Sequence, residues 1–164
     1  MRNLLIVLAF LVVPSFVYSA DEIHGDWKVS VHKDTQMTDT FTANNSGSVF
    51  GMICIAANDS CLFYVSPQTT CEDEAISNVL INSDAGALST EIKCMKLGDT
   101  YYSIIKETSA VQEAVMKSKN IGIAFPMENG QFKVVRFSLV GANAAIISAT
   151  EKAAIMVKTS DQLL

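Results

Sequence analysis

The positions of the cysteines constrain this chain more than any other feature. Three of the four lie in "GMICIAANDSCLFYVSPQTTC", residues 51–71, and the fourth is Cys94. Zinc sites usually bring cysteines in close pairs such as C-x2-C, and redox dithiols use C-x-x-C at the start of a helix. Neither spacing occurs here, and the surrounding residues alternate as in β-strands. We therefore expect structural disulfides, with no metal ligand and no catalytic residue, at Cys54, Cys61, Cys71 and Cys94.

Four cysteines can pair in three ways. Residues 49–56 and 61–66 predict a hairpin around a short loop. If the loop comprises residues 56–59, Cys54 faces Cys61 across the hairpin, and Cys71 is left to pair with Cys94. A shift of one residue removes this facing pair, so the other connectivities stay open. Each bridge would stabilise the fold by about 2–4 kcal/mol, mainly by restricting the unfolded chain.

The first 19 residues, "MRNLLIVLAFLVVPSFVYS", have the pattern of a secretory signal peptide: a basic residue, an apolar run and small residues at the end. We expect cleavage after Ser19, which places Val17 at the −3 position, or after Ala20, which places the bulkier Tyr18 there. The apolar run is short for a membrane span, and no later stretch is a candidate transmembrane segment. The expected localisation is therefore periplasmic or secreted, where disulfides persist.

The remaining chain, residues 20–164, shows no linker, repeat or low-complexity segment, so we expect a single disulfide-stabilised domain. Removing Arg2 from the 12 basic residues leaves 11 against 17 acidic ones, a net charge of about −6. This charge, with no basic run, argues against a nucleic acid or an anionic membrane as the partner. No glycine-rich phosphate loop or nucleotide fingerprint occurs, so no cofactor is expected.

Most of this domain alternates apolar and polar residues with the two-residue period of a half-buried strand. The clearest example is "DWKVSVH", residues 26–32, and a weaker strand follows at 38–43. Asn129 and Gly130 accept positive φ, which suits a type I′ turn between the last two strands. Besides the hairpin at 49–66, the further strands are expected at residues 75–82, 88–95, 99–106, 121–127 and 131–139.

Two segments change to the helical period. Val111, Ala114 and Val115 follow Ser109 at helical spacing, which predicts a short helix over residues 109–118. Residues 142–158 are rich in alanine and free of glycine and proline, so they favour a C-terminal helix. The expected fold class is α+β and mostly β, an antiparallel sheet or sandwich of about eight strands with the helices at one edge.

The remaining polar residues do not form a recognisable catalytic or metal-binding motif. His24 and His32 flank Trp27, but two histidines at this spacing would need further ligands from elsewhere to hold a metal. Glu72, Asp73 and Glu74 are consecutive acids that lack the spaced oxygens of a calcium loop, so we interpret them as a solvated turn. The serines have no recognisable base partner, and we expect no catalytic residue.

Three segments together resemble the invasion associated locus B family, small secreted proteins of Gram-negative bacteria. They are "HGDWKVS" just after the signal peptide, the disulfide-suited cysteines in the middle, and "FKVVRFSLVGANAAI" near the C-terminus. In that family a strand ending in Ser-Leu, then a glycine, leads into a final Ala-rich helix, and Ser138, Leu139, Gly141 and the residues from Ala142 onward are similar. The family's cysteine shortly after the tryptophan and its closely spaced cysteine pair have no counterpart here.

This resemblance implies a periplasmic or surface-associated β-rich protein linked to host-cell interaction, without an established catalytic activity. The leading hypothesis is a non-enzymatic protein that binds another protein or an envelope component. One alternative is a small inhibitor of a secreted hydrolase such as a lysozyme, with the acidic turn at residues 72–74 offered to a basic cleft. The other is a thiol-dependent enzyme, which would need a free, reactive cysteine.

Overall fold

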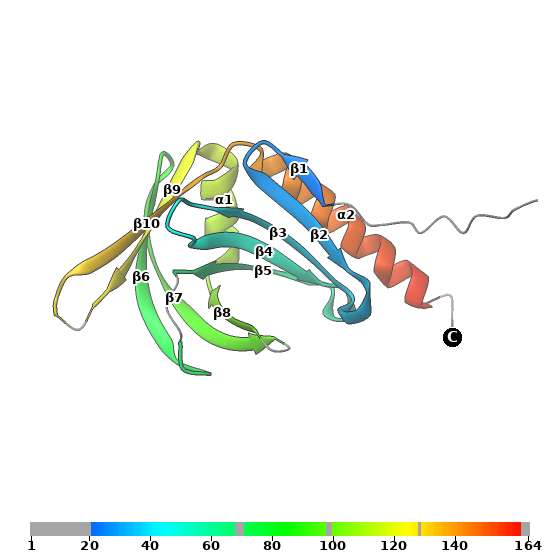
Figure 1. The fold of residues 1–164 in the computed structure, drawn as a ribbon, viewed down its shortest axis with the longest axis horizontal. Coiled ribbons are helices and arrows are strands. Elements are labelled where there is room, and N and C mark those ends of the chain that lie inside the picture. The colour runs from blue at the N-terminus through cyan, green and yellow to red at the C-terminus, as the bar shows by residue number, and fades with distance from the viewer. Residues whose placement is uncertain (1–20, 68–70, 98–99, 128, 162–164) are drawn as a thin grey trace, which may run out of the picture.

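A computed structural model describes residues 21–67, 71–97, 100–127 and 129–161; the expected signal peptide lies outside these ranges. Within them the chain forms one antiparallel sheet of ten strands and two α-helices (Figure 1). The strands are β1 (Glu22–His24), β2 (Trp27–His32), β3 (Met37–Ala43), β4 (Val49–Ile55), β5 (Ser60–Ser66), β6 (Ile76–Ser83), β7 (Gly86–Leu97), β8 (Thr100–Ile105), β9 (Asn120–Pro126) and β10 (Phe132–Ser138). The helices are α1 (Thr108–Lys117) and α2 (Ala142–Asp161), and 3-10 turns follow β2 (Lys33–Thr35) and β4 (Ala56–Asn58).

The α+β, mostly antiparallel class expected from the sequence is confirmed, but the number of strands is ten rather than about eight. The strand that was not foreseen, β1, has three residues, too few to show an alternating pattern, and it forms by pairing with β2. Both helices lie where the change of period places them. The order of strands across the sheet is β1-β2-β3-β4-β5-β8-β7-β6-β9-β10.

The turn between β9 and β10 differs from the type I′ turn expected at Asn129-Gly130. Only Gly130 of this pair has a positive φ, of 78°. Its amide donates to the Met127 carbonyl at 3.0 Å, and the Met127 amide donates to the Gln131 carbonyl. The turn is therefore longer than two residues, and the glycine serves one left-handed position near its end.

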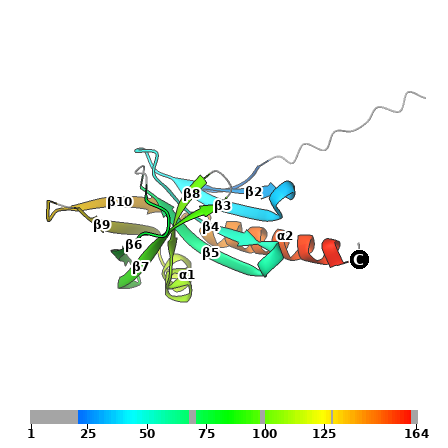
Figure 2. The same ribbon diagram turned by 90° about the horizontal axis from the view of Figure 1, so that it is seen from below.

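The sheet curls so that its last strand returns to its first strands. The Trp27 indole donates to the Ser138 carbonyl at 3.0 Å, and the side-chain amide of Asn44 donates to the Arg136 carbonyl at 3.2 Å. The connection from β10 to α2 passes beneath the β1–β2 turn at Gly141, where a Cβ would lie 2.0 Å from the His24 carbonyl oxygen. Only glycine fits there, with a φ of 89°. Beyond these contacts the β9–β10 hairpin extends away from the rest of the sheet (Figure 2).

The main core lies on the inner face of the curled sheet. Phe50 is its centre, with its ring centroid 5.7–5.9 Å from those of Trp27, Phe63 and Phe137. Helix α2 runs along this face of β1–β4 (Figure 1). Its buried stripe is mostly alanine, which lets the helix backbone come close enough for the buried Thr38 hydroxyl to donate to the Ala149 carbonyl at 3.0 Å. Neither described helix is long and apolar enough to cross a bilayer.

The sheet has one narrow junction, between β5 and β8. Only Tyr64 with Ile104 and Val65 with Ser103 are paired in register there, whereas β4 and β5 pair over seven residues each. The strands on the two sides of this junction, β1–β5 and β6–β10, are each joined by longer ladders. The junction therefore lies between two more continuous groups of strands.

Candidate functional site

The cysteines form two disulfides, as expected. Cys54 and Cys61 face each other on β4 and β5, with their Cα atoms 4.0 Å apart. Cys71 and Cys94 are bridged with a Cα–Cα distance of 6.0 Å, which ties the chain before β6 to β7. This is the connectivity that a loop at residues 56–59 favours. All four sulfurs are engaged, so their role in this structure is to hold the strands together.

The two histidines do not share a site. The His24 ring lies 2.7 Å from the Glu22 carboxylate, and His32 is exposed at the end of β2. Throughout the described part of the chain, no group of three His, Cys, Asp or Glu side chains is arranged to hold a metal ion.

The acidic segment before β6 is a turn, as expected, and the structure holds it in place. Glu72 and Asp73 are exposed. Glu74 has a positive φ of 67°, its amide donates to the Cys94 carbonyl at 3.0 Å, and its carboxylate forms an ion pair with Lys93 at 2.6 Å. The two exposed acids are thus presented by a segment that is fixed to the Cys71–Cys94 bridge.

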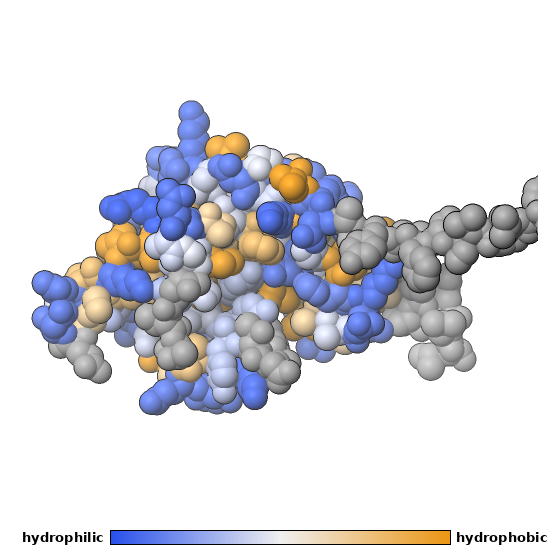
Figure 3. Space-filling view, in the orientation of Figure 1, coloured by the Kyte–Doolittle hydropathy of each residue, from blue (hydrophilic) through white to orange (hydrophobic). Residues whose placement is uncertain are grey.

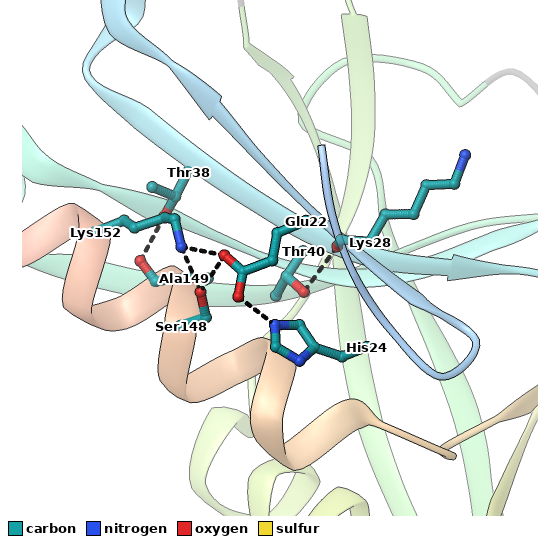
Figure 4. Close-up of polar contacts among 8 residues, drawn as sticks. All are labelled: Glu22, His24, Lys28, Thr38, Thr40, Ser148, Ala149 and Lys152. Carbon is teal, nitrogen blue, oxygen red and sulfur yellow. Dashed lines mark hydrogen bonds and ion pairs between the residues drawn. The ribbon is translucent and has the colours of Figure 1, made fainter. Parts of the chain in front are cut away.

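A polar cluster joins β1 to α2 (Figure 4). The Glu22 carboxylate accepts hydrogen bonds from Lys152 and from the Ser148 hydroxyl, the latter at 3.0 Å, and it contacts His24. These bonds, first that of Lys152, lower the Glu22 pKa to about 2. Ser148 also lies 2.6 Å from the Lys152 ammonium, as in a serine–lysine catalytic pair. Here, however, the Glu22 carboxylate forms an ion pair with the Lys152 ammonium and accepts the hydrogen bond of the Ser148 hydroxyl, so the cluster acts as a structural clasp.

A second group of apolar side chains lies on the outer face, the side of the sheet turned away from α2. Ile53, Tyr64 and Ile104 are only 3–5% exposed there, although no helix among the described residues covers them. In the space-filling view, apolar side chains interrupt the hydrophilic surface over β3 and β4 (Figure 3). We call this group the outer-face cluster; its partly buried members are Met37, Phe41, Val49, Ile55, Leu62, Met95 and Tyr102.

The polar centre of the outer-face cluster is Asp39 in the middle of β3. The Tyr64 hydroxyl, from β5, donates to its Oδ1 at 3.0 Å, although β4 runs between the two strands. Gly51 of β4 stands opposite both Phe41 and Tyr64, and a Cβ there would lie 2.4 Å from the Thr40 carbonyl oxygen. The missing side chain leaves the path over β4 open, so the tyrosine ring can cross it.

Burial decides the electrostatics of this pair. It raises the Asp39 pKa to about 6, against the lowering effects of the Tyr64 hydrogen bond and of the nearby His32. Burial and the Asp39 charge both raise the pKa of Tyr64 well above its usual range. The phenol of Tyr64 therefore stays protonated and donates a hydrogen bond to Asp39. No cation among the described residues forms a salt bridge with Asp39.

A hollow of about 240 Å³ opens beside this pair. The Tyr102 ring from β8 stands edge-on to Tyr64, with centroids 5.1 Å apart and planes at 89°. The hollow thus combines one half-buried carboxylate with several electron-rich rings, and it spans the junction between β5 and β8. Its lining residues are Asp39, Phe41, Val49, Tyr64, Ser66, Tyr101 and Tyr102.

Two larger hollows have less distinctive linings. One of about 760 Å³ lies between the Cys71–Cys94 bridge and the β9–β10 hairpin, and its one ammonium, Lys133, is already bound to the Pro67 carbonyl at 2.6 Å. The other, of about 390 Å³, lies over β6, β9 and β10 and is lined mainly by Asn, Gly and aliphatic residues. Neither brings a buried charge together with aromatic rings.

Sequence reasoning did not single out Asp39, Tyr64 or Tyr102, because they meet across strands that are distant in the sequence. Two signals point toward the site. The strand "VFGMICI" (Val49–Ile55) is apolar on both faces, which indicates that its outer face is not simply solvated. The glycine in the middle of this strand marks a close approach by another group.

No protein-family model and no curated protein matches the chain. Among solved structures, the fold is similar to the crystal structure of invasion associated protein B from Bartonella henselae. The TM-score is 0.56 and the sequence identity 12%, over 81% of this chain and 97% of that one. At this identity the similarity concerns the fold alone. The resemblance expected from the sequence is confirmed to that extent: the chain has a fold similar to that of invasion associated protein B.

Proposed function

We propose that this protein is a non-enzymatic binding protein of the periplasm or the extracellular space, and that it recognises a protein partner through the outer face of β3, β4, β5 and β8. The observation that carries the proposal is the outer-face cluster. A sheet normally buries one apolar face and leaves the other polar. Here the second face carries an apolar cluster whose outer members are only partly buried, and apolar surface of this kind is typical of an interaction site.

The compartment follows from different support. Two disulfides persist in oxidising surroundings and are rare in the cytosol. The expected signal peptide and the fold shared with invasion associated protein B agree with this compartment. The name of that protein connects it with invasion, and a role of this chain in contact with host cells is part of the proposal.

Binding fits the chemistry of the hollow better than catalysis does. Asp39 is the only carboxylate among the described lining residues, whereas hydrolysis of glycosides ordinarily uses two carboxylates on either side of the bond. Its hydrogen-bond partner is a tyrosine whose raised pKa keeps the phenol protonated, so no phenolate is available to act as a base. Among the described lining residues, the hydroxyl that contacts Asp39 is that of Tyr64, and its raised pKa makes it hard to activate as a nucleophile.

The test is capture of a partner from an envelope extract, followed by hydrogen-exchange mapping on the complex. We expect slowed exchange in β3, β4, β5 and β8. A Phe41→Ser variant should lose the partner, whereas Ile155→Ser, on the exposed side of α2, should retain it. Protection confined to α2 or to the β9–β10 hairpin would reject the outer face as the binding surface, as would equal capture by both variants.

A second function, inhibition of a secreted hydrolase, has its own observation. The exposed Glu72 and Asp73 are presented by a turn fixed to the Cys71–Cys94 bridge, and a rigid loop loses little entropy on entering an enzyme cleft. The double variant Glu72→Gln/Asp73→Asn tests it in inhibition assays with lysozymes and proteases. Inhibition by the parent protein that the variant loses would support this function. No inhibition of any enzyme in the panel would reject it.

A further inference from the structure

We propose that the hollow beside Asp39 is the anchor point of the partner, and that it receives one basic side chain, a lysine or an arginine. This inference rests on the proposed function and names the chemistry of the partner. It combines three observations: a half-buried carboxylate, a ring of aromatic side chains around it, and a volume that suits a single side chain.

The carboxylate comes first. Tyr64 satisfies Oδ1 of Asp39, and no other hydrogen bond to this carboxylate occurs among the described residues. A half-buried carboxylate costs free energy unless it is paired. A cation that entered the hollow would form the pair and gain a charge-assisted hydrogen bond.

The aromatic rings point to the same ligand. The faces of tyrosine and phenylalanine rings carry partial negative charge and attract ammonium and guanidinium groups. Tyr64, Tyr102, Tyr101 and Phe41 line the hollow. The chain already places one cation near this rim, since the Lys96 ammonium lies 5.8 Å from the centroid of Tyr101. An anionic ligand would be repelled by Asp39 and by the rings together.

The size of the hollow favours a single side chain over a larger ligand. At about 240 Å³ it is smaller than the 300–1,000 Å³ typical of small-molecule and cofactor sites. It opens on the outer-face cluster, so a side chain that enters it brings apolar neighbours of the partner onto Val49 and Phe41. The net charge of about −6 that remains without the expected signal peptide attracts basic partners over longer distances.

The described basic side chains near the hollow do not form an ion pair with Asp39. Lys28 is the neighbour of Phe41 across β2 and β3 and is exposed, and His32 lies farther along β2. Figure 4 shows the Lys28 side chain extended along the sheet, away from Ser148 and Glu22. None of these groups forms a salt bridge with Asp39, so the incoming cation would not have to displace one.

The experiment is an NMR titration of the full disulfide-bonded protein with small probes. The cationic probes are N-acetyl-lysine methylamide and N-acetyl-arginine methylamide; the uncharged controls are N-acetyl-norleucine methylamide and methyl β-glucoside. We expect saturable shifts of the amides of Val49, Ser66 and Tyr102 with the cations, and an affinity at least about tenfold weaker for norleucine. Equal or stronger shifts with norleucine or the glucoside, or no shift with any probe, would overturn the inference.

Variants locate the effect. Asp39→Asn keeps an acceptor for Tyr64 and removes the charge, and it should weaken the cationic probes about tenfold. Glu151→Gln removes one negative charge from exposed α2 and should leave binding unchanged. Tyr102→Leu keeps apolar bulk and removes the ring, and it should also weaken binding. A dispersed spectrum establishes that each variant is folded, and full affinity in both Asp39→Asn and Tyr102→Leu contradicts the anchor.

The two proposals can fail separately. If the captured partner protects β3, β4, β5 and β8 but binds Asp39→Asn as well as the parent protein, the outer face is the docking surface and the basic anchor is wrong. If protection lies elsewhere while the cationic probes still shift Val49 and Ser66, the hollow binds cations but the proposed docking surface is wrong.

Discussion

The Lys152 ammonium on α2 is hydrogen-bonded to the carboxylate of Glu22 on β1, a residue 130 positions earlier in the sequence. The contact joins the first strand of the described chain to its last helix. Since β1 has only three residues, its own ladder with β2 holds it weakly, and the clasp adds the tertiary contact that a short edge strand needs.

This clasp makes the fold sensitive to acid in a defined range. The Glu22 pKa is about 2 in the folded protein and near 4.5 in an unfolded chain, so the unfolded state binds the proton more readily. The stabilisation by Glu22 is therefore complete above about pH 5 and is lost as the pH falls toward 2. Urea unfolding of the parent protein and of Glu22→Gln should give free energies that differ at pH 6 and converge near pH 2. A constant difference across this range would contradict the assignment.

Asp39 changes the stability with pH in the direction opposite to Glu22. Its pKa is raised to about 6 in the folded protein from 3.8, so the folded state holds the proton more tightly than the unfolded chain. Stability should fall as the pH rises from about 4 to 6 and stay lower above it. Asp39→Asn should therefore stabilise the protein by about 1–2 kcal/mol at pH 7 and by much less at pH 4.

The measurement for Asp39 is urea unfolding at both pH values, with the carboxyl carbon followed by NMR to obtain its pKa. The comparison is repeated in a His32→Gln background, because the nearby His32 also acts on the Asp39 pKa. If Asp39→Asn destabilises the fold at pH 7, the carboxylate is not under the strain of burial described here.

The two disulfides should contribute unequally. Cys54–Cys61 closes a sequence separation of 7 and Cys71–Cys94 one of 23. Chain entropy gives about 2.5 kcal/mol for the short loop and about 3.5 kcal/mol for the long one. The double variants Cys54→Ala/Cys61→Ala and Cys71→Ala/Cys94→Ala should differ in that order in urea unfolding. Intact mass four hydrogens below the reduced value checks that the parent protein contains both bridges, and a reversed order would show that local packing outweighs loop length.

Gly51 should tolerate no side chain. In Gly51→Ala the new Cβ would meet the Thr40 carbonyl oxygen at 2.4 Å and the Phe41 Cβ at 2.8 Å, so the two strands must shift at a cost of about 1–3 kcal/mol. Gly122 in β9 is a matched control, because its nearest neighbour would be 3.7 Å from the new Cβ. Gly122→Ala should change the midpoint of thermal unfolding little. If it lowers this midpoint as much as Gly51→Ala does, the destabilisation comes from replacing any strand glycine and not from the close contact at Gly51.

Much of this fold could be predicted from the sequence where the pattern is local. Alternation and the loop at residues 56–59 located the β4–β5 hairpin and placed Cys54 opposite Cys61. The change of period located α1 and α2. The short strand β1 was not predicted, because it depends on tertiary contacts. The type of turn at Gly130 was predicted wrongly, because the Asn-Gly pair does not dictate its backbone geometry.

The candidate site could not be predicted in the same way. Asp39 and Tyr64 are 25 residues apart and meet only because β4 lies between their strands with a glycine at the crossing. Tyr102 joins them because β8 pairs with β5 rather than with a strand nearer in the sequence. Alternation shows which side chains share a face, but only the order of the strands shows which of them meet.

The narrow junction between β5 and β8 has a mechanical consequence. Asp39 and Tyr64 belong to the strands on one side of it, and Tyr101 and Tyr102 to those on the other. A side chain of the partner held among them would connect the two groups of strands at the junction where the fewest residues are paired. It would stiffen the two halves against twisting relative to each other, so a bound partner would make the whole molecule harder to pull apart.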